Sequence, residues 1–113
     1  QSFPVSEGVQ IRDFCYIDDI VNGLLLALEA DKARGQVLNI ASGIPQSVKE
    51  VVQLVVEMAR GGDPKFGEIA YRKGENMTLY ANTSNAKRIL NWSPKIDLQT
   101  GLRLTFDYYK RGW

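Results

Sequence analysis

The chain has 113 residues, the size of one domain, and 44% of them are hydrophobic, as in ordinary globular proteins. Fourteen basic and thirteen acidic residues leave a net charge of +1, which argues against a nucleic-acid-binding surface. One cysteine and no histidine exclude an internal disulfide and make a metal site unfavourable, and no apolar run is long enough to span a membrane. We therefore expect a cytoplasmic protein with neither nucleic-acid nor membrane partners. Because the chain begins at Gln1 and soon enters strand-like sequence, we also expect it to be part of a longer protein.

The first part of the chain alternates between strand and helix patterns. Apolar and polar residues alternate over 9–16, which predicts a strand. Apolar residues then recur three and four positions apart over 18–30, which predicts an amphipathic helix with Asp18 and Asp19 in its first turn. The run at 37–41 is apolar on both faces, as is typical of a strand between two layers of helices in a parallel sheet.

The second part begins with the clearest local signal. Ser47 and Glu50 have the spacing of a capping box and predict the start of a helix over 47–60, which Gly61 and Gly62 end. Three further elements are expected: a strand at 68–72, a helix from 82–84 to Leu90, and a last helix from near Asp97. This alternation indicates an α/β fold.

The sequence lacks the motifs that would carry catalysis. It contains neither a Gly-x-Gly-x-x-Gly loop nor a Tyr-x-x-x-Lys pair. Asp18 and Asp19 are neighbours, so their side chains would point about 100° apart on a helix. We therefore interpret them as charges at a helix start rather than as a catalytic carboxylate pair, and no catalytic residue is assigned.

Two arginines are candidates for binding an anion. Arg12 lies inside a predicted strand, and Arg72 ends another and is followed, past a glycine, by Glu75. A guanidinium group can bind phosphate through two parallel hydrogen bonds, and an acid beyond the turn could accept bonds from ribose hydroxyls. In the alternative interpretation, Arg12 pairs with Asp13 or Asp19 and Arg72 is a surface charge. Composition and spacing alone favour this alternative.

Five segments carry motifs in a fixed order along the chain. They are residues 8–21 (G-V-Q-I-R-D-F-C-Y-I-D-D-I-V), 37–43 with 47–50, 71–75 (Y-R-K-G-E), 86–94 (A-K-R-I-L-N-W-S-P) and 98–102 (L-Q-T-G-L). Together they resemble the extended short-chain dehydrogenase/reductase family, the NAD-dependent sugar-nucleotide epimerases and dehydratases. The resemblance implies that residues 1–113 are the substrate-binding, C-terminal portion of such an enzyme, without the N-terminal NAD(P)-binding portion. The implied fold is the end of a Rossmann-type doubly wound sheet with a small mixed lobe.

The resemblance also assigns roles to individual residues. Arg12 and Arg72 match the arginines that hold the diphosphate of the sugar nucleotide, and Glu75 matches the acid that binds its ribose. These matches favour the phosphate-binding interpretation of the two arginines. The aspartates at 13, 18 and 19 match positions that are expected to be mainly structural.

The implied parent enzyme uses NAD or NADP to act on a nucleoside diphosphate sugar as an epimerase, a dehydratase or a 4-keto reductase. Since the cofactor loop and the catalytic tyrosine are absent, we expect this chain alone to bind no cofactor and to be inactive. The apolar run at 37–41 and the valine-rich helix at 47–60 lead us to expect self-association. A stand-alone α/β binding or interaction module without catalysis is the alternative.

Overall fold

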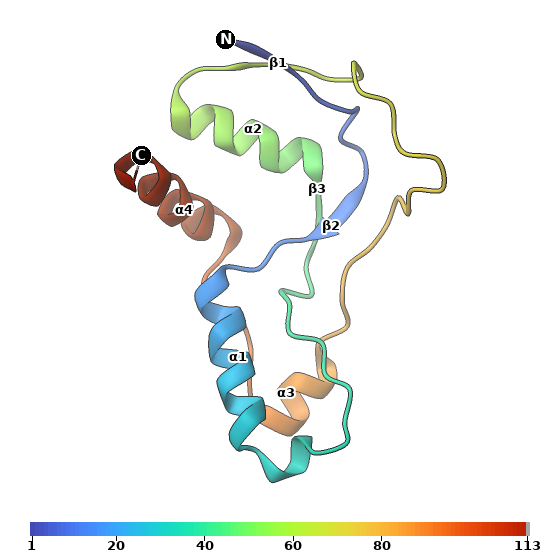
Figure 1. Cartoon of the computed structure of the whole chain (residues 1–113), viewed down its shortest axis with the longest axis vertical. Helices are drawn as coiled ribbons and strands as arrows, with labels where there is room; N and C mark the ends of the chain where they lie inside the picture. Colours follow the sequence, from blue (N-terminus) through green and yellow to red (C-terminus); the bar gives the residue numbers. More distant parts are fainter. Residues whose placement is uncertain (113) are drawn as a thin grey trace.

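Helices make up most of the regular structure in the computed structural model, which describes residues 1–112 and the side chains of residues 1–110 (Figure 1). The helices are α1 (Ile17–Glu29), α2 (Val48–Ala59), α3 (Ser84–Leu90) and α4 (Leu98–Gly112), and a short 3-10 helix, η1 (Asp31–Ala33), follows α1. All four predicted helices are confirmed, with ends close to the predicted ones. The α/β class is confirmed as well.

The capping box at the start of α2 is formed as predicted. The Ser47 hydroxyl accepts a hydrogen bond from the Glu50 amide at 3.1 Å, and the Ser47 amide donates to Glu50 Oε1 at 3.3 Å. The end of the helix differs slightly from the prediction. Arg60, before the two glycines, already adopts the left-handed conformation (φ 55°), so α2 stops at Ala59.

The described residues form two small sheets of two strands each. β1 (Ser2–Pro4) pairs in parallel with β4 (Asp63–Lys65), and β2 (Ile11–Asp13) pairs antiparallel with β3 (Pro45–Ser47). β2 is the central part of the strand predicted over 9–16. β3 leads directly into α2, so the antiparallel pair fixes the start of that helix beside β2.

The strands predicted at 37–41 and 68–72 are wrong for this structure, since neither segment joins a β-ladder. A strand is stable only when a neighbour accepts and donates its backbone hydrogen bonds. The described residues offer no such neighbour to 37–41, and Leu38 and Ile40 pack instead against the core. The segment at 68–72 belongs to the long loop between β4 and α3, whose one β-bridge pairs Thr78 with Ile11.

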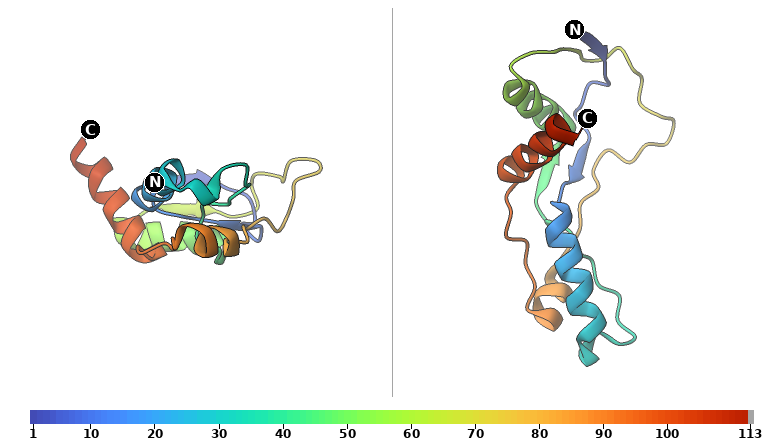
Figure 2. Two further views of the ribbon diagram at one scale, coloured as in Figure 1. Left: turned by 90° about the horizontal axis from the view of Figure 1, so that it is seen from below. Right: turned by 60° about the vertical axis from the view of Figure 1, so that its left-hand side comes forward.

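The chain is flat (Figures 1 and 2), and many of its large apolar side chains are exposed. It measures 50 × 37 × 19 Å, and its radius of gyration of 16.5 Å exceeds the roughly 13 Å of a compact domain of this length. Its accessible surface is 8217 Å², against about 6,200 Å² for a compact protein of this mass. The core cluster of the described residues consists of Ala86, Leu90 and Trp92.

Helix α1 carries several large apolar side chains that the rest of the described chain does not cover. Leu24, Leu25 and Leu28 are all exposed, Leu28 to 83%, and so is Val37 after η1. Large apolar side chains gathered in this way normally lie against another surface. Over residues 1–112, no helix combines the length and the apolar character that crossing a bilayer would require.

Candidate functional site

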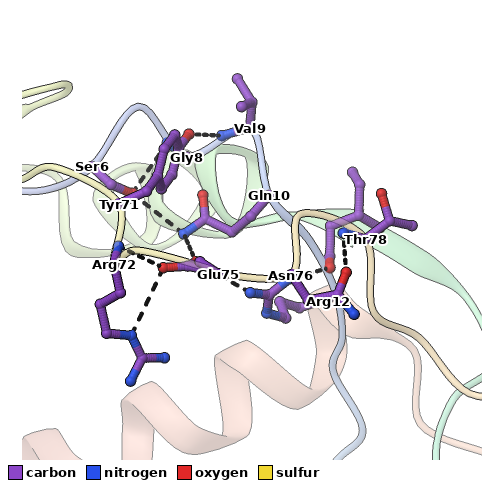
Figure 3. A network of polar contacts seen from close by, with 11 residues as sticks. Ser6, Gly8, Val9, Gln10, Arg12, Tyr71, Arg72, Glu75, Asn76 and Thr78 are labelled. Carbon is purple, nitrogen blue, oxygen red and sulfur yellow. Dashed lines mark hydrogen bonds and ion pairs between the residues drawn. The ribbon is translucent and has the colours of Figure 1, made fainter.

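Arg12 and Arg72 both lie beside Glu75, although the two arginines are 60 positions apart in the sequence (Figure 3). Arg12 Nη2 lies 3.2 Å from Glu75 Oε2, and Arg72 Nε lies 3.8 Å from Glu75 Oε1. The two guanidinium groups therefore hold opposite oxygens of a single carboxylate. The alternative in which Arg12 pairs with Asp13 or Asp19 is wrong, because the partner of Arg12 is Glu75.

β2 and the loop beside it position Arg12. The Ile11 amide donates to the Met77 carbonyl at 2.7 Å, and the Leu79 amide donates to the Ile11 carbonyl at 2.9 Å. These two bonds hold the long loop alongside β2. Arg12 Nη1 donates to the same Ile11 carbonyl at 2.8 Å, so its side chain, which is only 25% exposed, has a defined direction.

A tight turn positions Arg72 and Glu75 relative to each other. The Glu75 amide donates to the Arg72 carbonyl at 3.0 Å, and the Arg72 amide donates to Glu75 Oε1 at 3.3 Å. Gly74 has φ +78°, a conformation that glycine adopts without strain. In contrast with Arg12, the Arg72 side chain is 90% exposed. Its guanidinium is therefore open to solvent on the side away from Glu75.

Gln10 is a member of the site that the sequence analysis missed. It is 9% exposed, and its Nε2 lies 3.4 Å from Glu75 Oε2 and 3.3 Å from Ser6 Oγ. Its Oε1 is buried and has no hydrogen-bond partner among the described residues. The available signal was its spacing, since residues two apart on a strand share a face and Gln10 precedes Arg12 by two.

The carboxylates of Asp13 and Asp19 accept hydrogen bonds from backbone amides, as expected of residues with a structural role. Asp13 accepts hydrogen bonds from the Ser42 amide and hydroxyl and from two further amides, those of Gly43 and Ala81, at 2.7–3.2 Å. Asp19 is buried in the first turn of α1 and accepts from the amides of residues 95 and 96. Both carboxylates join segments that are remote in sequence. Asp18, the third position of this group, is exposed.

Acid is expected to weaken the fold partly through Asp13. Partial burial raises the pKa of this carboxyl, but the hydrogen bonds from Ser42, Ala81 and Gly43 outweigh it and leave the pKa below its usual value. The stabilisation is therefore complete above the unfolded-state pKa of about 3.9 and is lost as the pH falls through the lower folded-state pKa. Urea unfolding between about pH 5 and pH 2 should show a smaller loss of stability for Asp13→Asn than for the wild type. An unchanged pH dependence in Asp13→Asn, matching that of the exposed control Asp31→Asn, would contradict this role.

The described residues do not fit a nicotinamide dinucleotide or a metal ion. Pyrophosphate of a dinucleotide needs a glycine-rich turn that leads from a strand into a helix N-terminus. α1 follows Tyr16 and α2 follows Ser47, and neither approach is rich in glycine. No group of three potential metal ligands occurs within residues 1–112. The arrangement around Glu75, with two cations on one carboxylate, is instead suited to an anion.

Comparison with known proteins adds a family and a set of relatives. The family model described as GDP-mannose 4,6 dehydratase matches residues 1–105. The chain is 33% identical to a UDP-glucuronate 4-epimerase of Thermodesulfobacterium geofontis, covering 92% of this chain and 32% of that protein. It is 37% identical to a UDP-glucose 4-epimerase of Corynebacterium glutamicum, covering 87% of this chain and 30% of that protein.

A solved structure has the same arrangement of elements. The UDP-glucuronic acid 4-epimerase of Bacillus cereus, in complex with UDP-glucuronic acid and NAD, aligns with a TM-score of 0.82 at 30% identity. The alignment covers 97% of this chain and 36% of the epimerase. The chain thus spans about a third of the length of the relatives that it matches.

Proposed function

Because the chain belongs to the GDP-mannose 4,6-dehydratase family, we propose that it is the substrate-binding part of a longer, cytoplasmic NAD(P)-dependent enzyme. The substrate of that enzyme is a nucleoside diphosphate sugar, and its reaction is an epimerisation, a dehydration or a 4-keto reduction. The cofactor and the catalytic residues lie in the remainder of the protein. When NAD(P) is bound in that remainder, it supplies the hydride transfer at the sugar.

The observation that carries the proposal is the meeting of Arg12 and Arg72 at Glu75. Two guanidinium groups face one carboxylate, so the cluster keeps one uncompensated positive charge. A diphosphate carries its charge on two neighbouring phosphates and can accept hydrogen bonds from both arginines at once. Arg12 is held in place by the Ile11 carbonyl, whereas the exposed Arg72 is free to turn toward a ligand.

Glu75 and the names of the relatives narrow the choice of ligands to test. An acid beside a diphosphate site can accept hydrogen bonds from the hydroxyls of a ribose, which is the role proposed for Glu75. The relatives are named for UDP-glucuronate and UDP-glucose, so UDP-sugars are the first substrates to test.

The exposed apolar surface supports the proposal that this chain is part of a larger protein. Leu24, Leu25 and Leu28 of α1 lie open, and the apolar run at 37–41 has no strand neighbour. In the relatives, about two thirds of the protein lies outside the matched region, which is ample to cover this surface. Contact with a second copy is the alternative, and it would also suit a non-catalytic interaction module.

Hydrogen exchange in the full-length protein tests the proposal. Saturating UDP is expected to slow amide exchange in residues 9–13 and 71–79, because the ligand would hold β2 and the loop together. NADH is expected to protect segments outside residues 1–113 more strongly than these. The proposal would be contradicted if UDP slowed amide exchange in neither of these two segments, or if NADH protected these segments more than the rest of the protein.

A further inference from the structure

The Glu75 carboxylate lies where the proposed function requires a phosphate. It is bound on one side by Arg12 Nη2 and on the other by Arg72 Nε, the groups that a diphosphate would use. The carboxylate and the phosphate have the same sign of charge and accept from the same donors. Because like charges repel, the carboxylate and a phosphate compete for the two guanidinium groups.

Two neutral donors hold the carboxylate independently of the guanidinium groups. Gln10 Nε2 lies 3.4 Å from Oε2, and the Arg72 backbone amide donates to Oε1 at 3.3 Å. Gln10 is nine-tenths buried, and its own Oε1 is left without a partner among the described residues. Leaving a buried acceptor unpaired costs stability, so the orientation of this amide is better explained by its contact with Glu75 than by packing alone.

We propose that Glu75 is an internal competitor for the anion site. Its carboxylate occupies Arg12 and Arg72 while the site is empty, and the diphosphate of the ligand displaces it. Gln10 is the positioning residue that keeps the displaced carboxylate at the edge of the site, where a ribose can reach it. The inference rests on the proposed function, since it takes a diphosphate as the displacing group.

The geometry indicates that the displacement is easy. The arginine contacts, at 3.2 and 3.8 Å, are longer than the roughly 2.7–2.9 Å of strong charge-assisted hydrogen bonds. Arg72 is almost fully exposed, and ion pairs at such positions are weak. Removing the charge of Glu75 should therefore strengthen the binding of a bare diphosphate only modestly, by about threefold to tenfold.

Calorimetric titration of the full-length protein with inorganic pyrophosphate tests this inference. Pyrophosphate has the two phosphates but no ribose, so it isolates the competition from the ribose contact. Glu75→Gln is expected to bind it about threefold to tenfold more tightly than the wild type. Glu68→Gln is the matched control, because Glu68 is an exposed acid of the same loop and its loss changes the net charge equally. This control should stay within about twofold of the wild type.

Each result has a distinct consequence. If Arg12→Ala weakens pyrophosphate binding but Glu75→Gln binds no more tightly than Glu68→Gln, the internal competitor is refuted and the proposed function stands. If pyrophosphate does not bind the wild type and Arg12→Ala leaves sugar-nucleotide binding unchanged, both are refuted. Should Glu75→Gln fail to fold, the carboxyl ¹³C signal of Glu75 in the wild type decides. It is expected to shift as pyrophosphate saturates the site, and a constant signal would refute the inference.

Discussion

Replacing Arg12 with alanine is expected to weaken the binding of a nucleoside diphosphate sugar to the full-length protein about tenfold to a hundredfold. A hydrogen bond to a charged partner typically contributes about 1.5–3 kcal/mol, which corresponds to that range. Arg12 is partly buried and held by the Ile11 carbonyl, so little ordering is required when the phosphate binds. The effect should appear in KM with kcat nearly unchanged, because the proposed contact is with the diphosphate and not with the sugar.

Two further arginine variants set the scale of this effect. Arg72→Ala should raise KM by about tenfold, toward the lower end of the range, because the exposed Arg72 side chain must be ordered on binding. Arg34→Ala removes the same charge from η1, where the arginine is exposed and lies 4.0 Å from Asp31. It should leave KM within about twofold of the wild type. A similarly small change in Arg12→Ala would contradict the diphosphate site.

Replacing Trp92 with alanine is expected to lower the free energy of unfolding by about 3–5 kcal/mol. Trp92 is 4% exposed and is the largest member of the core cluster, in which it packs with Ala86 and Leu90. Its indole Nε1 also donates to the Asp19 carbonyl at 3.1 Å, which joins α1 to the segment after α3. Few other buried apolar side chains can compensate, since the described core is small.

Urea unfolding of the full-length protein measures this loss. Trp92→Phe keeps an aromatic ring but removes the N–H group, so it should cost about 1–2 kcal/mol, less than alanine. Equal and small losses in both variants would show that Trp92 is not part of the core of the folded protein.

The helices could be predicted because their stabilising contacts are local. Each backbone hydrogen bond in a helix joins residues four apart, and the apolar residues of the buried face recur every three or four positions. The start of α2 is the clearest case, where Ser47 and Glu50 satisfy each other within one turn. α1 follows the same rule, with the acids of its first turn placed as predicted.

The strands depended on partners that no local pattern identifies. The run at 37–41 has the composition of a buried strand, yet it forms no ladder because the described residues provide no neighbour for it. β1 and β4 were not predicted, and they pair across 61 positions in a register that begins with Ser2 and Asp63. Backbone pairing at such separations is decided by the whole fold rather than by the residues of one segment.

The same distinction applies to the candidate site. Residue chemistry and the family resemblance were enough to name Arg12, Arg72 and Glu75 as candidates. The tertiary structure alone placed Glu75 between the two arginines and added Gln10 as a further contact of the Glu75 carboxylate. The physical reason is the pairing of the long loop with Ile11, which brings its turn against β2 through backbone bonds that no side-chain pattern in the sequence encodes.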